Sequence, residues 1–352
     1  MKIWKIESKS MFYNEVLYTS EDELRSILNI SNKMEYYGNP IEIPKKDGKR
    51  IIYSINSASR LYNLQKNLSK NFLSNILLPD MVHGFRKETN YIEYLLPHVN
   101  FYRNHFYLRL DIKNFFQSIK TDSIKGMLEY YFRINEDFTA FDVKIILDKI
   151  IDLLMYNDEL VQGAPTSPVI SNLVFRKLDI RIQKYCRCFH INYTRYADDM
   201  LFSSVNPVLW KNSFISGIAK IISSDNLELN YSKIVRAKNY ISLGGYVISD
   251  SIRLSRTKLS NLSRVLFYVE NHKDYRSQLY YEKINNLIKS ETNSDKLKIK
   301  GIYELINYFA GNRAFIISVL KYSNDNSFCK KAQKIIERLD NIIIKLDNTI
   351  KK

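Results

Sequence analysis

Two adjacent aspartates stand in a segment that favours a tight turn between two strands. Residues 191–203 read Ile-Asn-Tyr-Thr-Arg-Tyr-Ala-Asp-Asp-Met-Leu-Phe-Ser, with bulky β-forming residues on both sides of Asp198 and Asp199. This pattern predicts a strand, a turn and a second strand. Because crowded carboxylates repel each other, a hard divalent cation with oxygen ligands normally compensates them. An acidic hairpin turn without a metal is the alternative interpretation, since aspartate also favours turns.

A third carboxylate, Asp111, follows an apolar, strand-like segment that begins at Phe106. A single aspartate at a strand end is usually only a helix cap. Together with Asp198 and Asp199, however, it supplies the carboxylates from separate strands that two-metal nucleotidyl transfer requires, with the ions about 3.5 to 4 Å apart. Mg²⁺ needs few protein ligands and leaves positions for phosphate oxygens. The sequence therefore predicts that these three aspartates bind two Mg²⁺ ions.

Between these carboxylates lies a turn rich in glycine and proline, Gln162-Gly-Ala-Pro-Thr-Ser-Pro168. Gly163 would allow close approach of the backbone to a ligand, and Gln162 offers both a donor and an acceptor beside it. An ordinary junction between a loop and a helix is the alternative. The following segment predicts an amphipathic helix with an apolar face formed by Val169, Ile170, Leu173, Val174 and Leu178.

Length and charge indicate what these residues act on. The 352 residues predict two or three subdomains, and the net charge of +16 with a pI near 9.4 favours a polyanionic partner. No apolar run approaches the roughly 20 residues that span a bilayer, and residues 1–8 lack a signal-peptide core, so we expect a cytoplasmic protein without a membrane partner. Three cysteines suit a reducing compartment. Cys186, Cys188 and His190 would make a poor zinc site, since no second cluster accompanies them.

The basic excess is concentrated in the last third of the chain. Residues 251–352 contain 20 Lys and Arg against 10 Asp and Glu, a net of +10. Helical periodicity is also clearest there, which predicts a helical, basic C-terminal domain. A merely solvated surface is the alternative for the individual lysines. The final helix would bury Ala332, Ile335, Ile336, Leu339, Ile342, Ile343 and Leu346, with Lys330, Lys331, Lys334, Arg338 and Lys345 on other faces.

Five segments, in this order, resemble the palm motifs of reverse transcriptases, with flanks closest to the bacterial retron-type branch. Upstream, the segment from Ile43 to Arg50, with Gln65 and His83-Gly-Phe-Arg86, is similar to the family's fingers. The five palm segments are Leu110-Asp-Ile-Lys-Asn-Phe-Phe116, Gln162-Gly-Ala-Pro-Thr-Ser-Pro168, Tyr193-Thr-Arg-Tyr-Ala-Asp-Asp199, Leu227-Glu-Leu-Asn-Tyr-Ser-Lys233 and Leu243-Gly-Gly-Tyr246.

The resemblance implies an α+β right-hand polymerase whose palm contains a small antiparallel sheet. Residues 1–40 would form an N-terminal helical segment and 41–105 the fingers. Residues 106–250 would form the palm, with a fingers insertion at about 121–160, and 251–352 a helical, basic thumb that binds RNA. Aromatic thumb residues could stack on unpaired bases, although most are expected in the core: Tyr268, Tyr280, Tyr281, Tyr303 and Phe309.

The resemblance also implies a role for each matched residue. Asp199 would be a less direct metal ligand than Asp111 and Asp198, and Phe116 would be the steric gate that selects deoxynucleotides. Lys233 would protonate the departing pyrophosphate, and Tyr196 would lie near the primer end. Leu243-Gly-Gly-Tyr246 would form the primer grip. Gln162 and Gly163 would line the incoming nucleotide, and Lys45 or Lys46 with Arg50 would neutralise its triphosphate. A solvated hairpin is the alternative for these basic residues.

Two departures separate the chain from the retron pattern. The stretch Tyr94-Leu-Leu-Pro-His98 retains only the histidine of the usual Asn-Ala-x-x-His, and Ser242-Leu-Gly244 replaces Val-Thr-Gly. Neither change touches the three aspartates. Both leave open a related, defence-associated reverse transcriptase.

The resemblance implies a retron component that copies part of a structured noncoding RNA into DNA. Its partners would be this RNA as template and primer, the DNA product, deoxynucleoside triphosphates and an effector protein encoded nearby. The product would be a branched RNA-DNA hybrid, msDNA, serving antiphage defence. Weakly templated DNA synthesis and a noncatalytic RNA-binding scaffold are the two alternatives.

Overall fold

A computed structural model describes most of the chain and divides it into two compact units. The first unit comprises Met1–Tyr94 and Leu108–Arg236, and the second comprises Leu95–Tyr107 and Ala237–Lys352. The division into fingers, palm and thumb stays a prediction. The described residues are 4–29, 35–45, 48–53, 55–87, 89–101, 104–289 and 298–351, without the side chains of 44, 45, 48–50 and 289.

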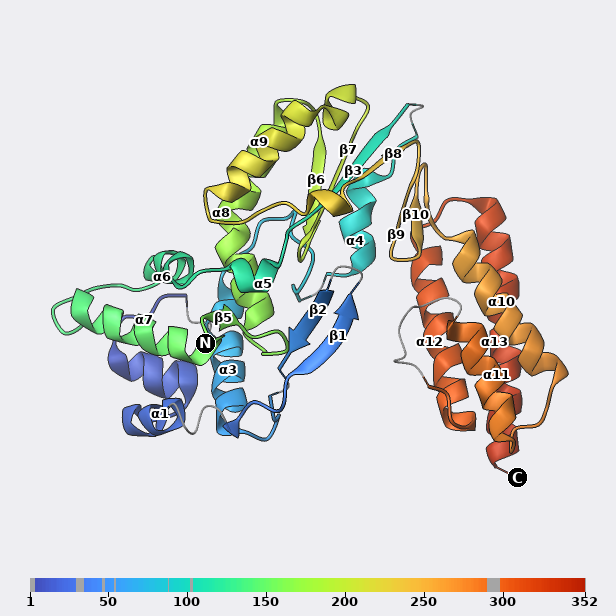
Figure 1. Cartoon of the computed structure of the whole chain (residues 1–352), viewed down its shortest axis with the longest axis horizontal. Coiled ribbons are helices and arrows are strands. Elements are labelled where there is room, and N and C mark those ends of the chain that lie inside the picture. The colour runs from blue at the N-terminus through green and yellow to red at the C-terminus, as the bar shows by residue number, and fades with distance from the viewer. Residues whose placement is uncertain are drawn as a thin grey trace. The chain divides into compact units, whose positions relative to one another are not determined.

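The first unit contains most of a four-stranded sheet in which strands distant in the sequence become neighbours. The strand order is β6-β7-β3-β8, so β3 lies next to β7 (Figure 1). Strands β6 and β7 are antiparallel, with Tyr196 paired to Asp199, which confirms the predicted hairpin. The strands are β3 (Phe106–Asp111), β6 (Asn192–Tyr196), β7 (Asp199–Ser204) and β8 (Val235–Lys238).

The helices of the first unit pack on one another, and α8 packs on this sheet. The long helix α8 packs on β6 and α9 and buries Ile170, Leu173, Val174 and Leu178. These are four of the five residues of the predicted apolar face, whereas Val169 is half-buried. Short 3₁₀ or π turns cover Met11–Leu17, Leu73–Asn75, Pro207–Trp210 and Tyr231–Lys233. The helices are α1 (Glu21–Leu28), α3 (Arg60–Asn71), α4 (Tyr91–Leu95), α5 (Phe115–Ser118), α6 (Thr121–Glu129), α7 (Ala140–Leu154), α8 (Ser167–Arg187) and α9 (Asn212–Ser223).

Two small hairpins complete the first unit. Strands β1 (Ile41–Lys45) and β2 (Gly48–Ile52) pair antiparallel, with Ile43 opposite Arg50. Strands β4 (Met155–Tyr156) and β5 (Glu159–Leu160) form the second hairpin, directly before the turn that contains Gln162. Lys45 pairs with Gly48, so Lys45, Lys49 and Arg50 belong by their backbone to the end of this strand pair.

The second unit joins a three-stranded sheet to a helical bundle (Figure 1). A short 3₁₀ turn covers Leu96–His98, and the strand order is β11-β10-β9. Helix α12 packs on α13, and α10 packs on α11 and α13. The elements are β9 (Ile241–Leu243), β10 (Tyr246–Ile248), β11 (Ile252–Leu254), α10 (Arg256–Asn271), α11 (Gln278–Lys289), α12 (Ile302–Leu320) and α13 (Asn326–Ile350).

Helix α13 confirms the predicted amphipathic C-terminal helix. It buries Ala332, Ile335, Leu339, Ile342 and Leu346, whereas Ile336 and Ile343 are half-buried. The side chains of Lys330, Lys331, Lys334 and Lys345 are exposed. Within the described ranges, none of the helices combines the length and the apolar character that crossing a membrane requires.

Candidate active site

Strands β3 and β7 bring Asp111 to the turn that carries the two adjacent aspartates. The backbone N–H of Ile112 donates a 3.1 Å hydrogen bond to the carbonyl oxygen of Asp198. Asp111 is the last residue of β3, and Asp199 is the first residue of β7. Three carboxylates that are separated by up to 88 positions in the sequence, from Asp111 to Asp199, therefore lie at neighbouring strand ends.

The side chain of Asp111 is almost completely buried and is compensated by Lys233. The Lys233 ammonium donates hydrogen bonds of 2.9 and 3.1 Å to the two carboxylate oxygens. The Lys233 side chain is 48% exposed, so this ammonium also reaches solvent. A further contact joins the same segments, because the backbone N–H of Asn230 donates to the carbonyl oxygen of Asp111 at 2.8 Å. The structure thus brings together two residues that were matched to separate motifs.

Asp199 is held by Arg109, which was not predicted as a site residue. Arg109 donates from Nε and Nη2 to the two carboxylate oxygens of Asp199 at 2.8 and 2.7 Å. Burial raises the pKa of Asp199 above its ordinary value, Arg109 opposes this shift, and Asp198 and Asp111 add to it. The charges of all three aspartates therefore interact. Side chains alternate along a strand, so Arg109, two residues before Asp111, projects from the same face as Asp111. This spacing could have identified Arg109 from the sequence.

The turn itself rests on a buried polar network. Arg195 is fully buried and donates two hydrogen bonds to Asp179, at 2.8 and 2.7 Å. It also donates to Asn172 Oδ1 at 3.0 Å and to the carbonyl oxygen of Ala197 at 2.8 Å. Ala197 has a φ of 56°, a left-handed conformation that non-glycine residues rarely adopt. These hydrogen bonds hold the turn in its strained conformation, and they were not predicted from the sequence.

The donor set fits a hard divalent cation. Carboxylate oxygens are the protein ligands that Mg²⁺ prefers, and one or two carboxylates suffice when substrate phosphates complete the coordination. Asp111 and Asp198 are two such carboxylates, and Asp199 is tied to Arg109. In the part of the chain that the structure describes, no group of three or more His, Cys, Asp or Glu side chains is arranged to hold a metal. The three aspartates are thus neighbours, but their side chains do not form a complete metal-binding site by themselves.

The aromatic residues near the turn form two packed groups in the first unit. The Tyr196 ring is 4.9 Å from that of Tyr91 and 5.8 Å from that of Tyr94, measured between centroids. Phe116, the second residue of α5, is half-buried, and its ring lies 5.7 Å from that of Phe115 and 6.1 Å from that of Phe85. The contact with Phe85 was not predicted.

The backbone of Gly163 lies close to the backbone of Tyr53. It has a φ of 111°, and a Cβ atom at this position would lie 2.8 Å from the carbonyl oxygen of Tyr53. Gln162 precedes it and is half-buried. Of the predicted triphosphate residues, Lys45 and Arg50 belong by their backbone to β1 and β2, whereas Lys46 lies outside the described residues.

In the second unit, the predicted primer grip forms the turn between β9 and β10. Leu243 pairs with Tyr246, and the two glycines between them have φ angles of 57° and 87°. Such a turn with two positive φ values matches the twist of a hairpin and favours glycine. A Cβ atom on Gly245 would lie 3.0 Å from Cδ of Lys258. The structure thus explains both glycines by backbone conformation.

Asp111 with Lys233, and Asp199 with Arg109, lie at adjacent strand ends within the part of the chain that a family model matches. The family model described as "Reverse transcriptase (RNA-dependent DNA polymerase)" matches residues 43–248, more than half of the chain. The chain therefore belongs to the reverse transcriptase family. This confirms the predicted family, the right-hand polymerase fold class and the predicted enzyme class, an RNA-directed DNA polymerase.

Curated relatives are retron reverse transcriptases. The chain is 29% identical to the retron Ec86 reverse transcriptase of Escherichia coli over 64% of its length and 68% of that protein. It is 26% identical to the retron Mx65 enzyme of Myxococcus xanthus, with 67% and 56% covered. It is 35% identical to the retron Ec73 enzyme of Escherichia coli, with 46% and 51% covered. The chain thus spans between half and about two thirds of these relatives.

Proposed function

We propose that this chain is the reverse transcriptase of a retron. It binds a structured noncoding RNA in the cytoplasm, copies part of it into DNA, and leaves a branched RNA-DNA hybrid, msDNA. This product serves antiphage defence together with an effector protein encoded nearby. One observation carries the proposal: Asp111 and Asp198 meet at adjacent strand ends in a chain whose curated relatives are retron enzymes.

The three aspartates would hold two Mg²⁺ ions at the neighbouring ends of β3 and β7. Ions held there would activate the primer hydroxyl and neutralise the charge of the leaving phosphate. Asp111 and Asp198 serve as the direct ligands. Asp199 contributes less directly, because the rigid guanidinium fork of Arg109 holds both of its carboxylate oxygens, whereas the ammonium at Asp111 belongs to the flexible, half-exposed Lys233. Lys233, whose ammonium is already at Asp111, is the proton donor for the departing pyrophosphate.

The incoming deoxynucleoside triphosphate would meet residues of the first unit. Phe116 lies under the sugar and disfavours a 2′-hydroxyl, and Tyr196 packs near the primer end. Positioning and charge neutralisation provide most of the rate enhancement in such reactions. The remaining assignments are Gln162 and Gly163 beside the nucleotide and Lys45, Lys46 and Arg50 at its triphosphate.

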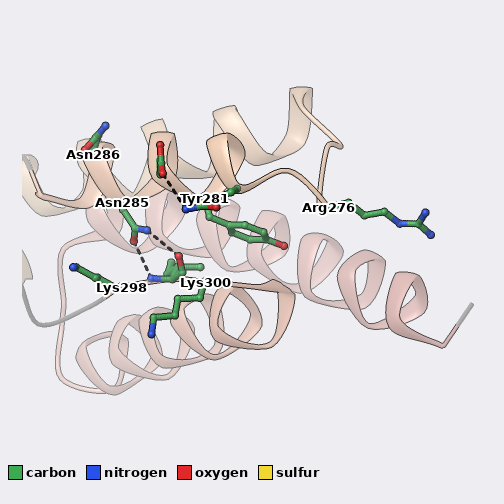
Figure 2. A pocket seen from close by; sticks show the side chains of 9 residues that line it. Arg276, Tyr281, Asn285, Asn286, Lys298 and Lys300 are labelled. Carbon is green, nitrogen blue, oxygen red and sulfur yellow. Dashed lines mark hydrogen bonds between the residues drawn. The ribbon is translucent and has the colours of Figure 1, made fainter.

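The basic second unit would bind the RNA. The exposed lysines of α13 supply sites for phosphates, and salt-dependent binding follows from the counterions they displace. Tyr303 is 66% exposed and available for stacking, whereas Tyr280, Tyr281 and Phe309 are buried in the core. A cavity of about 650 Å³ beside α11 adds further basic groups, because Arg276, Lys298 and Lys300 line it (Figure 2).

Two side chains of α11 shape this cavity. Asn285 bonds to both the N–H and the carbonyl oxygen of Ile299, at 2.9 and 2.8 Å, and so fixes the segment that carries Lys298 and Lys300 (Figure 2). One turn earlier, the Tyr281 hydroxyl donates to the carbonyl oxygen of Tyr275, next to Arg276, at 2.8 Å. This geometry supports a role in holding RNA phosphates.

The test is the nucleic acid that copurifies with the protein. The chain is expressed with the genomic segment that flanks its gene, and the bound nucleic acid is sequenced before and after ribonuclease treatment. DNA of one defined sequence, covalently joined to RNA, is the expected result. RNA alone would indicate a noncatalytic scaffold, and repetitive or untemplated DNA would indicate weakly templated synthesis. Asp198→Asn provides the control, since its preparation should contain RNA without DNA.

A further inference from the structure

The loop at residues 82–86 is locked against the turn that carries the aspartates. His83 donates from its backbone N–H to the carbonyl oxygen of Arg195 at 2.9 Å, and Asn172 donates to the carbonyl oxygen of Gly84 at 2.7 Å. A Cβ atom on Gly84 would lie only 2.5 Å from the backbone nitrogen of Ala197. The loop backbone and the turn are therefore in direct contact, with no room for a side chain between them.

Phe85 is held in a strained conformation by this arrangement. Its φ is 58°, in the left-handed region, where a bulky aromatic residue is an outlier. Strain of this kind persists only when the surrounding structure imposes it, and it is concentrated at functional sites. The Phe85 side chain is nevertheless 44% exposed, so burial of the ring does not explain why phenylalanine occupies the position.

The strained residue directs its ring to Phe116. The two ring centroids are 6.1 Å apart with an interplanar angle of 57°. Phe115 contacts Phe116 at 5.7 Å and is itself packed on Phe175 of α8 at 5.7 Å. Phe116 therefore has one neighbour anchored in the core and a second, Phe85, anchored to the aspartate turn. Together these neighbours restrict the positions that the Phe116 ring can adopt.

We propose that Phe85 is a specificity-determining positioning residue that fixes the Phe116 ring for sugar discrimination. This inference rests on the proposed role of Phe116 at the nucleotide sugar. Phe85 is tied through Gly84 to the turn that carries Asp198 and Asp199. The Phe116 ring and these carboxylates therefore keep a constant relative position. A gate that could tilt away would admit a 2′-hydroxyl and would also position deoxynucleotides less well.

Phe85→Gly separates this role from a structural one, since glycine adopts a positive φ without strain. The variant should fold with a melting temperature no lower than that of the parent protein. Its preference for deoxynucleotides over ribonucleotides, measured as a ratio of kcat/KM values, should fall by about tenfold. Phe85→Tyr retains the ring and should restore the preference. An unchanged preference in Phe85→Gly would overturn the inference.

Phe116→Ala, assayed in parallel, distinguishes failure of this inference from failure of the proposed gate. If Phe116→Ala loses the preference and Phe85→Gly keeps it, Phe116 is the gate and Phe85 does not position it. If Phe116→Ala also keeps the preference, the gate assignment is wrong and the role of Phe85 falls with it.

Discussion

Arg109 donates two hydrogen bonds to Asp199 from the strand that also ends in Asp111. The bonds measure 2.8 and 2.7 Å and use the planar fork of the guanidinium. Side chains alternate along a strand, so Arg109 and Asp111, two residues apart, project from the same face of β3. One strand therefore supplies a carboxylate and also the cation that orients the carboxylate of its neighbour.

Replacing Arg109 should alter both the rate of DNA synthesis and its pH dependence. Arg109→Gln removes the group that opposes the burial-driven rise in the pKa of Asp199, so this pKa rises further. Activity that requires ionised Asp199 is then lost at a higher pH as the solution is acidified. We expect a fall of about 10- to 100-fold near neutral pH and an acidic limb displaced to higher pH.

A pH-rate profile of single-nucleotide incorporation provides the measurement for Arg109→Gln. Arg187→Gln is the matched control, because Arg187 is exposed at the end of α8. An acidic limb that coincides with that of the parent protein would show that Arg109 does not tune Asp199.

The buried ion pair between Arg195 and Asp179 should contribute strongly to the stability of the first unit. Arg195 and Asp179 are both 0% exposed, so Asp179→Ala leaves a buried guanidinium without its carboxylate. Removing one partner of a buried pair costs about 3 to 5 kcal/mol. Thermal unfolding should show a large fall in Tm for Asp179→Ala. Glu7→Gln, which disrupts an exposed pair with Arg133, should change Tm little. Equal effects of the two variants would contradict the assigned importance of the network.

Two glycines offer a matched test of the contact between the loop and the turn. Gly84→Ala places a methyl group 2.5 Å from the Ala197 nitrogen, so the turn must shift and DNA synthesis should fall strongly. Gly126→Ala, in α6, meets no atom within 4 Å and should raise stability by about 0.5 to 1 kcal/mol without affecting synthesis. Primer extension and thermal unfolding measure both effects. Full activity in Gly84→Ala would contradict the close packing.

The lysines of α13 should contribute to RNA affinity through electrostatics. Replacing Lys330, Lys331 and Lys334 by Glu should weaken RNA binding and reduce its dependence on salt, because fewer counterions are released. The slope of log K against log salt concentration is the measurement. The control replaces three exposed lysines of the first unit by Glu: Lys120, Lys184 and Lys211. If the salt dependence of the α13 variant equals that of the parent protein, the RNA does not bind at these lysines.

The sequence was sufficient for features that depend on local pattern. The hairpin with Asp198 and Asp199, the apolar face of α8 and the amphipathic α13 follow from alternation and helical periodicity. The contacts of Arg109 with Asp199, of Arg195 with Asp179 and of Phe85 with Phe116 were not predicted, because each joins residues of different elements that only the fold brings together. Arg195 stands within a run of β-forming residues. Its burial could be predicted only if the carboxylate that compensates its charge were known.

The most direct test of the central claim is nucleotide incorporation on a primed RNA template in Mg²⁺. Asp111→Asn and Asp198→Asn keep the size of each side chain and remove its charge. Each variant should lose at least about 100-fold in the rate of DNA synthesis while RNA affinity stays near that of the parent chain. Synthesis at the parental rate in either variant would contradict the assignment of these carboxylates to catalysis.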